Sequence, residues 1–184
     1  MTTVDAFPSA HLDPGIDTDR RYTTRETMDL CMRLAGVDAW DLDVAADAES
    51  HWAPIWYDAQ NDGLNQPWSG RVWCNPPFSD LAPWVKRAWC EFLRPDNRPE
   101  TIAMLVPATR TEQPWWQNWV EPYRDRAESP YAHPILYDES LDADARLTTR
   151  FLPGRIKFGH PGNREAHGVG SPPFGCVLLV WRRT

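Results

Sequence analysis

The first strongly patterned stretch of the chain predicts an amphipathic helix between Thr23 and Gly36. Its apolar residues recur at positions i, i+3, i+4 and i+7, which share one helix face: Met28, Cys31, Met32 and Ala35. Glu26 follows Thr23 by three positions, so the two are expected to form a capping box with Thr23 as the N-cap. Gly36 readily adopts the left-handed conformation that ends many helices, and the helix is expected to stop there.

The strongest helical periodicity in the sequence follows a proline-rich turn. Six apolar residues recur at the spacing of one helix face: Leu81, Trp84, Val85, Ala88, Trp89 and Phe92. Ser79 or Asp80 is expected to cap this helix, and Pro83 falls in its first turn, where the missing N–H of proline costs little. A third, shorter helix is expected around Trp115, Trp116, Trp119 and Val120, with Trp119 packed in the core.

Short apolar runs between the helices predict buried strands. They are expected at residues 40–45, 71–74, 101–106, 155–158 and 175–181. Residues 46–70 are rich in turn formers, and residues 121–148 are acidic and contain prolines, so most of the latter is expected to be loop. Helices alternating with such strands indicate an α/β protein with a doubly wound sheet, in which ligands bind at the carboxyl ends of the strands.

Length and composition favour one compact globular domain. The chain has 184 residues, 42% of them hydrophobic and 24% charged. We expect a flexible tail at residues 1–20 and the domain at residues 21–184. No apolar run is long enough for a bilayer and the N-terminus lacks a signal-peptide pattern, so a cytoplasmic protein with no membrane contact is expected. The four cysteines and five histidines show no ligand spacing, which indicates reduced thiols and no metal site.

Charge is distributed unevenly along the chain. The 19 basic and 26 acidic residues give a net charge of −7, which argues against a protein that coats nucleic acid by bulk attraction. Residues 151–184, however, carry five basic residues and one acidic residue, a net of +4. This segment could make a local contact with a polyanion or could be a solvated surface, and charge alone leaves both interpretations open.

The turn Asn75-Pro76-Pro77-Phe78 stands where a strand is expected to end and a helix to begin. One interpretation is a rigid turn that only ends the strand. The other is a site for a planar amine, such as the exocyclic amine of adenine. The Asn75 side-chain carbonyl and the Pro76 backbone carbonyl would accept the two amino hydrogens, and Phe78 would stack on the ring of the base. Such hydrogen bonds would point the nitrogen lone pair at an electrophilic methyl group, so no covalent nucleophile is needed.

An Asn-Pro-Pro-aromatic turn is the signature of amino-methyltransferases, and further segments extend the similarity. They are residues Leu42 to Glu49, Asp62 to Leu64, Trp68 to Phe78, Leu105 to Ala108, Arg110 to Glu112 and Gly154 to Gly159. From about Tyr22 to Trp181 the chain resembles the phage-type DNA N6-adenine methyltransferase (Dam-like) family. The resemblance implies a Rossmann-like methyltransferase fold, S-adenosylmethionine as methyl donor and DNA as substrate. It also implies a role in masking phage or plasmid DNA from restriction in a bacterial host cytoplasm.

The resemblance assigns roles to individual residues. The catalytic residues would be Asn75, Pro76, Pro77 and Phe78. The loop from Asp43 to Ala46 would hold the cofactor, with Asp43 as its anchor and the small Ala45 letting the backbone approach. Asp62 is a weaker candidate, and Thr24 would lie near the cofactor carboxylate, although simple helix capping explains Thr23 and Thr24 equally well. The chain departs from the family where Ala45-Ala46 replaces a Gly-rich turn and Arg25 stands in place of proline.

Candidate DNA-binding residues lie at a strand end and in the basic segment. Arg110 and Trp115 follow an expected strand on the rim of the site, where aromatic and cationic residues suit a base flipped out of a duplex. Core packing competes as an interpretation of Trp115. Arg155 and Lys157 stand two apart on an expected strand and would share one face, with solvated surface as the alternative.

Two other motifs are interpreted as having no role in the chemistry. Ser171-Pro172-Pro173-Phe174 resembles the signature of cytosine amino methyltransferases, but it precedes the final strand and is expected at the wrong edge of the sheet. Cys74 precedes Asn75, whereas cytosine C5 methylation needs a cysteine that follows proline. No phosphate-binding Gly-Lys-Ser/Thr loop is present.

The sequence thus favours a DNA adenine N6-methyltransferase, with rivals in other classes. Methylation of cytosine N4, an RNA adenine or a protein glutamine would use the same turn. A non-catalytic module that holds single-stranded nucleic acid on the Trp-rich face would bind no cofactor, and a structural phage protein with a relict fold would do neither. The small size leaves little room for a target-recognition domain, so low sequence specificity is expected.

Overall fold

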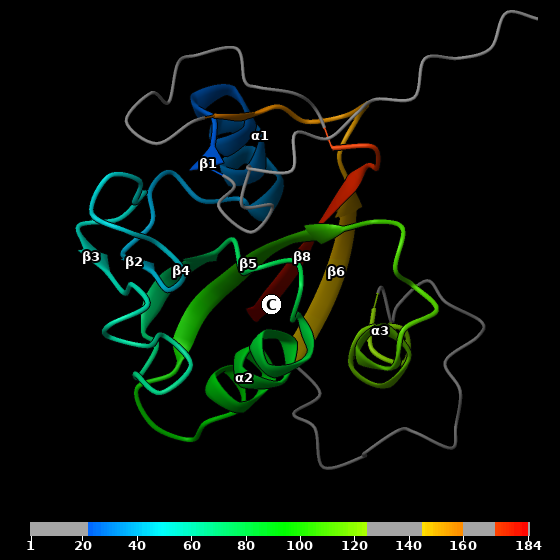
Figure 1. Ribbon diagram of the computed structural model, residues 1–184. Coiled ribbons are helices and arrows are strands. Elements are labelled where there is room, and N and C mark those ends of the chain that lie inside the picture. The colour runs from blue at the N-terminus through cyan, green and yellow to red at the C-terminus, as the bar shows by residue number, and fades with distance from the viewer. Residues whose placement is uncertain (1–21, 125–144, 160–171, 184) are drawn as a thin grey trace, which may run out of the picture.

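The computed structural model describes residues 22–124, 145–159 and 172–183, so the tail expected at 1–20 lies outside the described residues. Its main feature is a six-stranded mixed sheet in the order β3-β2-β4-β5-β8-β6 (Figure 1). The strands are β2 (Leu42–Asp43), β3 (Ile55–Trp56), β4 (Gly70–Cys74), β5 (Pro99–Pro107), β6 (Ala145–Phe151) and β8 (Cys176–Arg183). A separate two-stranded sheet pairs β1 (Tyr22–Thr23) with β7 (Phe158–Gly159).

Strand direction divides the large sheet into two parts. β3, β2, β4 and β5 run parallel to one another, β8 is antiparallel to β5, and β6 is antiparallel to β8. The centre is apolar throughout, since β5 is buried from Thr101 to Pro107 and β8 from Cys176 to Trp181. Such continuous apolar strands need cover on both faces, and Figure 1 shows α1 on one side of the sheet and α2 and α3 on the other.

The helices match the predicted periodicity and the predicted stop at Gly36, but not the predicted N-caps. α1 spans Arg25–Ala35 and ends at Gly36, whose φ is 69°. Its N-cap is Thr24, so the prediction of Thr23 is wrong by one residue, because Thr23 belongs to β1 and pairs with Phe158. α2 spans Ala82–Phe92 with Leu81 as N-cap and no side-chain capping bond, so neither Ser79 nor Asp80 caps it. α3 spans Pro114–Trp119.

Three strand predictions need correction. The strand expected at 40–45 is reduced to the two residues of β2. The loop expected over 121–148 gives way at Ala145 to β6, whose alternation of polar and apolar residues suits an edge strand rather than a buried one. Residues 155–157 precede β7 and are not in a strand. The fold is therefore mixed α/β with few helices, and no helix in the described ranges is long and apolar enough to cross a membrane.

Candidate active site

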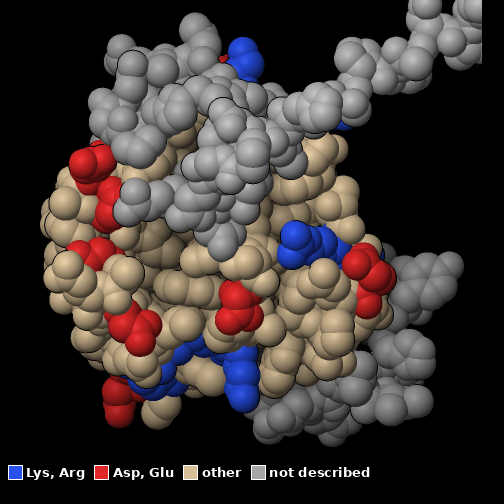
Figure 2. Space-filling view, in the orientation of Figure 1, with Lys and Arg blue, Asp and Glu red and all other residues tan. Residues whose placement is uncertain are grey.

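A cavity of about 480 Å³ opens where β2, β3 and β4 end. Its floor and walls come from the ends of these strands and the residues after them, from β1 and from the start of α2. Its charged lining residues are all acidic: Asp43, Asp47, Asp58 and Asp62. No described Lys or Arg lines it, and Figure 2 shows acidic side chains along the side of the molecule that carries β2 and β3. Such a cavity favours a cationic ligand over an anionic one.

Asp43 anchors the loop that follows β2. Its carboxylate is 2% exposed and accepts hydrogen bonds from the backbone N–H of Trp52 at 3.0 Å and of Ala45 at 3.4 Å. These bonds compensate for the burial of the charge. Burial, with Asp43 close by, also raises the pKa of the Cys74 thiol well above its usual range, so this thiol stays protonated beside the site.

The second wall is the segment after β3, where Asp62 and Gly63 line the cavity. A Cβ atom on Gly63 would lie 2.0 Å from the carbonyl oxygen of Val44, so the two cavity segments touch backbone to backbone. Ala45, on the opposing loop, also lines the cavity. The Asp62 carboxylate accepts the side-chain N–H of Asn65 at 2.6 Å and the backbone N–H of Leu64 at 3.2 Å, so it shapes its own turn.

At the N-terminal wall of the cavity, two adjacent threonines have different surroundings. Thr23 lines the cavity, is 2% exposed, and its hydroxyl has no hydrogen-bond partner among the described residues. Thr24 is not a lining residue, and its hydroxyl is engaged with Thr27 and with the backbone carbonyl of Lys157 at 3.4 Å. The structure therefore places Thr23, rather than the predicted Thr24, on the cavity.

Two aromatic residues, Tyr22 and Trp52, complete this wall, and the sequence analysis identified neither as a site residue. The hydroxyl of Tyr22 donates to Asp47 at 2.6 Å, and the guanidinium of Arg25 lies 5.0 Å from the centre of the Trp52 ring. Arg25 stands where the resemblance predicts proline, and here it packs on a residue that lines the cavity. No sequence pattern indicated these contacts, because their partners lie about 25 residues away along the chain.

The turn after β4 brings Asn75 and Pro77 into the same cavity. Pro76 is buried, and Phe78 is 4% exposed, with its ring centre 6.1 Å from that of Phe158 and 6.2 Å from that of Phe174. Phe78 is thus part of an aromatic cluster behind the cavity, and it is not a lining residue.

Phe174 lies at the carboxyl edge, which contradicts the expectation for the second Pro-Pro-Phe turn. Because β8 runs antiparallel to β5, the beginning of β8 pairs with the end of β5, with Cys176 opposite Pro107. The residues just before β8 therefore reach the edge where the parallel strands end. The prediction was wrong because it assumed that the final strand runs in the direction of its neighbours.

The candidate DNA-binding residues occupy different environments. Arg110 donates to the backbone carbonyl of Phe78 at 2.9 Å and so braces the turn. Trp115 is only 5% exposed and packs against Trp116, which places it in the core, whereas Trp119 is 36% exposed and is not the core residue expected.

The exposed pair Arg155 and Lys157 flanks the buried Ile156 in an extended segment. They are not in a strand, so the prediction that the two side chains share one face of a strand stays untested. The segment leads directly into β7, whose partner β1 carries Tyr22 and Thr23 of the cavity wall.

A mixed α/β sheet with an acidic cavity at its carboxyl edge is compatible with a methyltransferase. A model of the DNA N-6-adenine-methyltransferase (Dam) family matches residues 28–183, which is most of the chain, and the chain belongs to this family. Membership confirms the resemblance and implies adenine-N6 methyltransferase activity with DNA as substrate. The match begins at Met28, so Thr23 and Thr24 lie outside it. A comparison with curated proteins found no match.

Proposed function

We propose that this protein transfers a methyl group from S-adenosylmethionine to N6 of adenine in DNA, on a Rossmann-like methyltransferase fold and with low sequence specificity. One observation carries the proposal: the loop anchored by Asp43 and the turn of Asn75 line a single cavity. A methyl donor held by the loop would therefore face an amine held by the turn. Direct transfer needs that adjacency, since the two reactants must meet without an enzyme-bound intermediate.

The residues of the cavity fit the proposed cofactor. S-adenosylmethionine carries a sulfonium and an ammonium group, and the cavity offers four carboxylates and no described basic residue. The buried Thr23 hydroxyl supplies a hydrogen-bonding group that has no partner among the described residues, which is costly unless a ligand uses it. The contact of Gly63 with Val44 gives a narrow cradle of backbone beside Ala45.

The chain's own residues would orient and activate the amine. The cofactor supplies an electrophilic methyl group on a sulfonium centre. Asn75 and the Pro76 carbonyl would accept the two hydrogens of the N6 amine and turn its lone pair toward that group. The sulfonium would leave as a neutral thioether when the methyl group is transferred, and the methylated amine would give up one proton to solvent. Phe78 would stack on the flipped base only if the base reached beyond the cavity lining to the cluster that Phe78 forms with Phe158 and Phe174.

DNA would approach from the side of Arg110, Arg155 and Lys157. The acidic cavity repels phosphates, so the backbone of DNA needs cationic contacts elsewhere. Arg110 braces the turn of Phe78, and the segment of Arg155 and Lys157 leads into the β1–β7 sheet at the cavity wall. Trp115 is buried, so it would not touch DNA but would support the DNA-binding side from the core.

Transfer of labelled methyl from S-adenosylmethionine to unmethylated duplex DNA, followed by nucleoside analysis, tests the proposal. N6-methyladenine is the expected product. N4-methylcytosine would keep the mechanism but change the target. Cofactor binding without transfer to DNA would point to RNA or protein as substrate. If the protein neither transferred methyl groups nor bound the cofactor, the proposal would be contradicted. That result would favour a non-catalytic nucleic-acid-binding module.

A further inference from the structure

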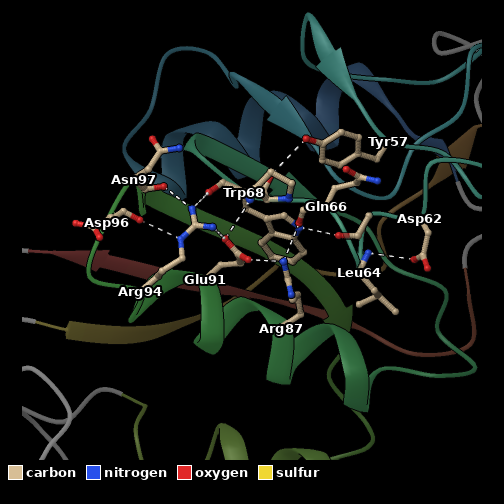
Figure 3. A network of polar contacts seen from close by, with 12 residues as sticks. Tyr57, Asp62, Leu64, Gln66, Trp68, Arg87, Glu91, Arg94, Asp96 and Asn97 are labelled. Carbon is tan, nitrogen blue, oxygen red and sulfur yellow. Dashed lines mark hydrogen bonds and ion pairs between the residues drawn. The ribbon is translucent and has the colours of Figure 1, made fainter.

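An ion cluster at the C-terminal end of α2 joins Arg87 and the buried Glu91 of the helix to Arg94, two residues beyond its end (Figure 3). The side chain of Glu91 is 4% exposed and lies between the two guanidinium groups, with Arg94 at 3.0 Å and Arg87 in closer contact. Its carboxylate also accepts the backbone N–H of Trp68 at 3.1 Å. Neither the family match nor the proposed chemistry assigns a role to this cluster.

All three members of the cluster form hydrogen bonds with the backbone of the segment between β3 and β4. Arg87 donates to the carbonyl of Gln66 at 2.9 Å, and Arg94 donates to the carbonyl of Trp68 at 3.1 Å. Trp68, which is fully buried, extends the contact because its indole N–H donates to the carbonyl of Gly63 at 2.8 Å. A continuous chain of hydrogen bonds thus runs from the cluster to a residue that lines the cavity.

The segment from Tyr57 to Trp68 depends on such external support. Most of its first half lines the cavity: Tyr57, Asp58, Ala59, Gln60, Asp62 and Gly63. It contains no helix or strand, and Asp62 has a φ of 51°, a conformation that L-residues rarely adopt. Hydrogen bonds to the carboxylates of Asp58 and Asp62 fix the local shape of these turns, but the position of the segment against α2 is set by what it packs against.

Charge is an expensive way to fill this space. Burying a carboxylate between two guanidiniums costs desolvation that an apolar cluster of similar size avoids. The charges do something that apolar residues cannot, because the two arginines donate to the carbonyls of Gln66 and Trp68 and Glu91 accepts the backbone N–H of Trp68. The cluster therefore specifies the position of the segment rather than only filling space.

We propose that Arg87, Glu91 and Arg94 are positioning residues that hold the cavity wall at residues 57–63 and thereby set the affinity for the cofactor. The proposal rests on the proposed function insofar as the cofactor occupies this cavity. The cluster touches neither Asn75 nor the aromatic cluster through any described contact, so the transfer step itself does not depend on it. Binding of the cofactor and the transfer rate should then separate on substitution.

The variant Glu91→Gln tests this separation. It keeps the shape of the side chain but removes the charge that orients both guanidiniums. We expect the Kd and KM for S-adenosylmethionine to rise about tenfold, which corresponds to about 1.4 kcal/mol. The kcat and the KM for DNA should stay within about twofold of the wild type. Calorimetric titration with cofactor and initial-rate kinetics measure these four constants.

Asp41→Asn is the matched control, because it breaks an Arg–carboxylate pair next to β4 that does not line the cavity. It should change none of the four constants. Hydrogen exchange on the ligand-free proteins adds a readout that does not depend on the cofactor. In Glu91→Gln the amides of residues 57–68 should exchange faster, while those of α1 and β5 keep their protection.

Two results would overturn the proposal. One is that in Glu91→Gln the amides of residues 57–68 exchange at the wild-type rate and the cofactor affinity is also that of the wild type. The other is loss of protection over the whole sheet, with kcat falling in step with affinity, which would make the cluster a general stabiliser. A wild-type protein that binds no cofactor would instead defeat the proposed function, and the exchange data would still decide whether the cluster positions this segment.

Discussion

The two ends of the parallel strands use polar residues in opposite ways. At the carboxyl ends, Asp43 and Asn75 stand on a cavity, together with the buried hydroxyl of Thr23. At the amino ends, Arg71 pairs with Asp41 at 2.9 Å and also contacts Asp38, and these groups satisfy one another. The first set is placed for a ligand and the second for the fold, so substitutions at the two ends should affect different measurements.

Asn75→Ala should have the largest effect and should separate activity from stability most clearly. Loss of one preorganised acceptor from the turn is expected to lower the rate of methyl transfer about 10³-fold. The Kd for S-adenosylmethionine should change by less than about twofold, because Asp43 and its loop are unaltered. Initial rates and calorimetric titration measure the two effects. Methyl transfer at the wild-type rate would show that the turn does not act on the amine.

Thr23→Val and Thr24→Val form a matched pair at the boundary between the two kinds of role. Thr23→Val removes the buried hydroxyl of a residue that lines the cavity, a hydroxyl with no hydrogen-bond partner among the described residues, so cofactor affinity should fall about five- to tenfold with no loss of stability. Thr24→Val removes the N-cap of α1, so the protein should lose about 1 kcal/mol of stability with unchanged affinity. Thermal denaturation and cofactor titration of both variants distinguish the roles. The reverse result would return the cofactor contact to Thr24.

Asp41→Asn should have the smallest effect, confined to stability. The guanidinium of Arg71 lowers the pKa of the Asp41 carboxyl to about 2, and a carboxyl with a lowered pKa stabilises the fold above its unfolded pKa of about 4. That contribution disappears as the pH falls from about 4 to about 2. Because Asp41 is 46% exposed, the expected loss in the variant is at most about 1 kcal/mol at pH 7.

Urea denaturation of wild type and Asp41→Asn between pH 2 and pH 7 measures this difference. The two curves of stability against pH should converge toward pH 2. A constant gap over the whole range would mean that the substitution acts through packing and not through the charge of Asp41.

The sequence predicted the helices, strands and turns whose formation depends on residues close together in the chain. α2 and β5 follow from helical periodicity and from an apolar run, and the turn at Asn75 follows from its two prolines. The direction of β8 could not be predicted, because it depends on which neighbours the strand meets, and the misplacement of Phe174 followed from that. Thr23 was missed as a cavity residue for a similar reason, since its strand partner is Phe158.

The position of β8 also bears on how the chain is made. This strand follows all the others in sequence, yet it lies inside the sheet between β5 and β6. During synthesis the edge of β5 that pairs with β8 therefore stays unpaired until residues 176–183 have been made. Unpaired edges of this kind recruit other chains, so the interval before β8 is made is when the nascent protein is most exposed to aggregation and most dependent on chaperones.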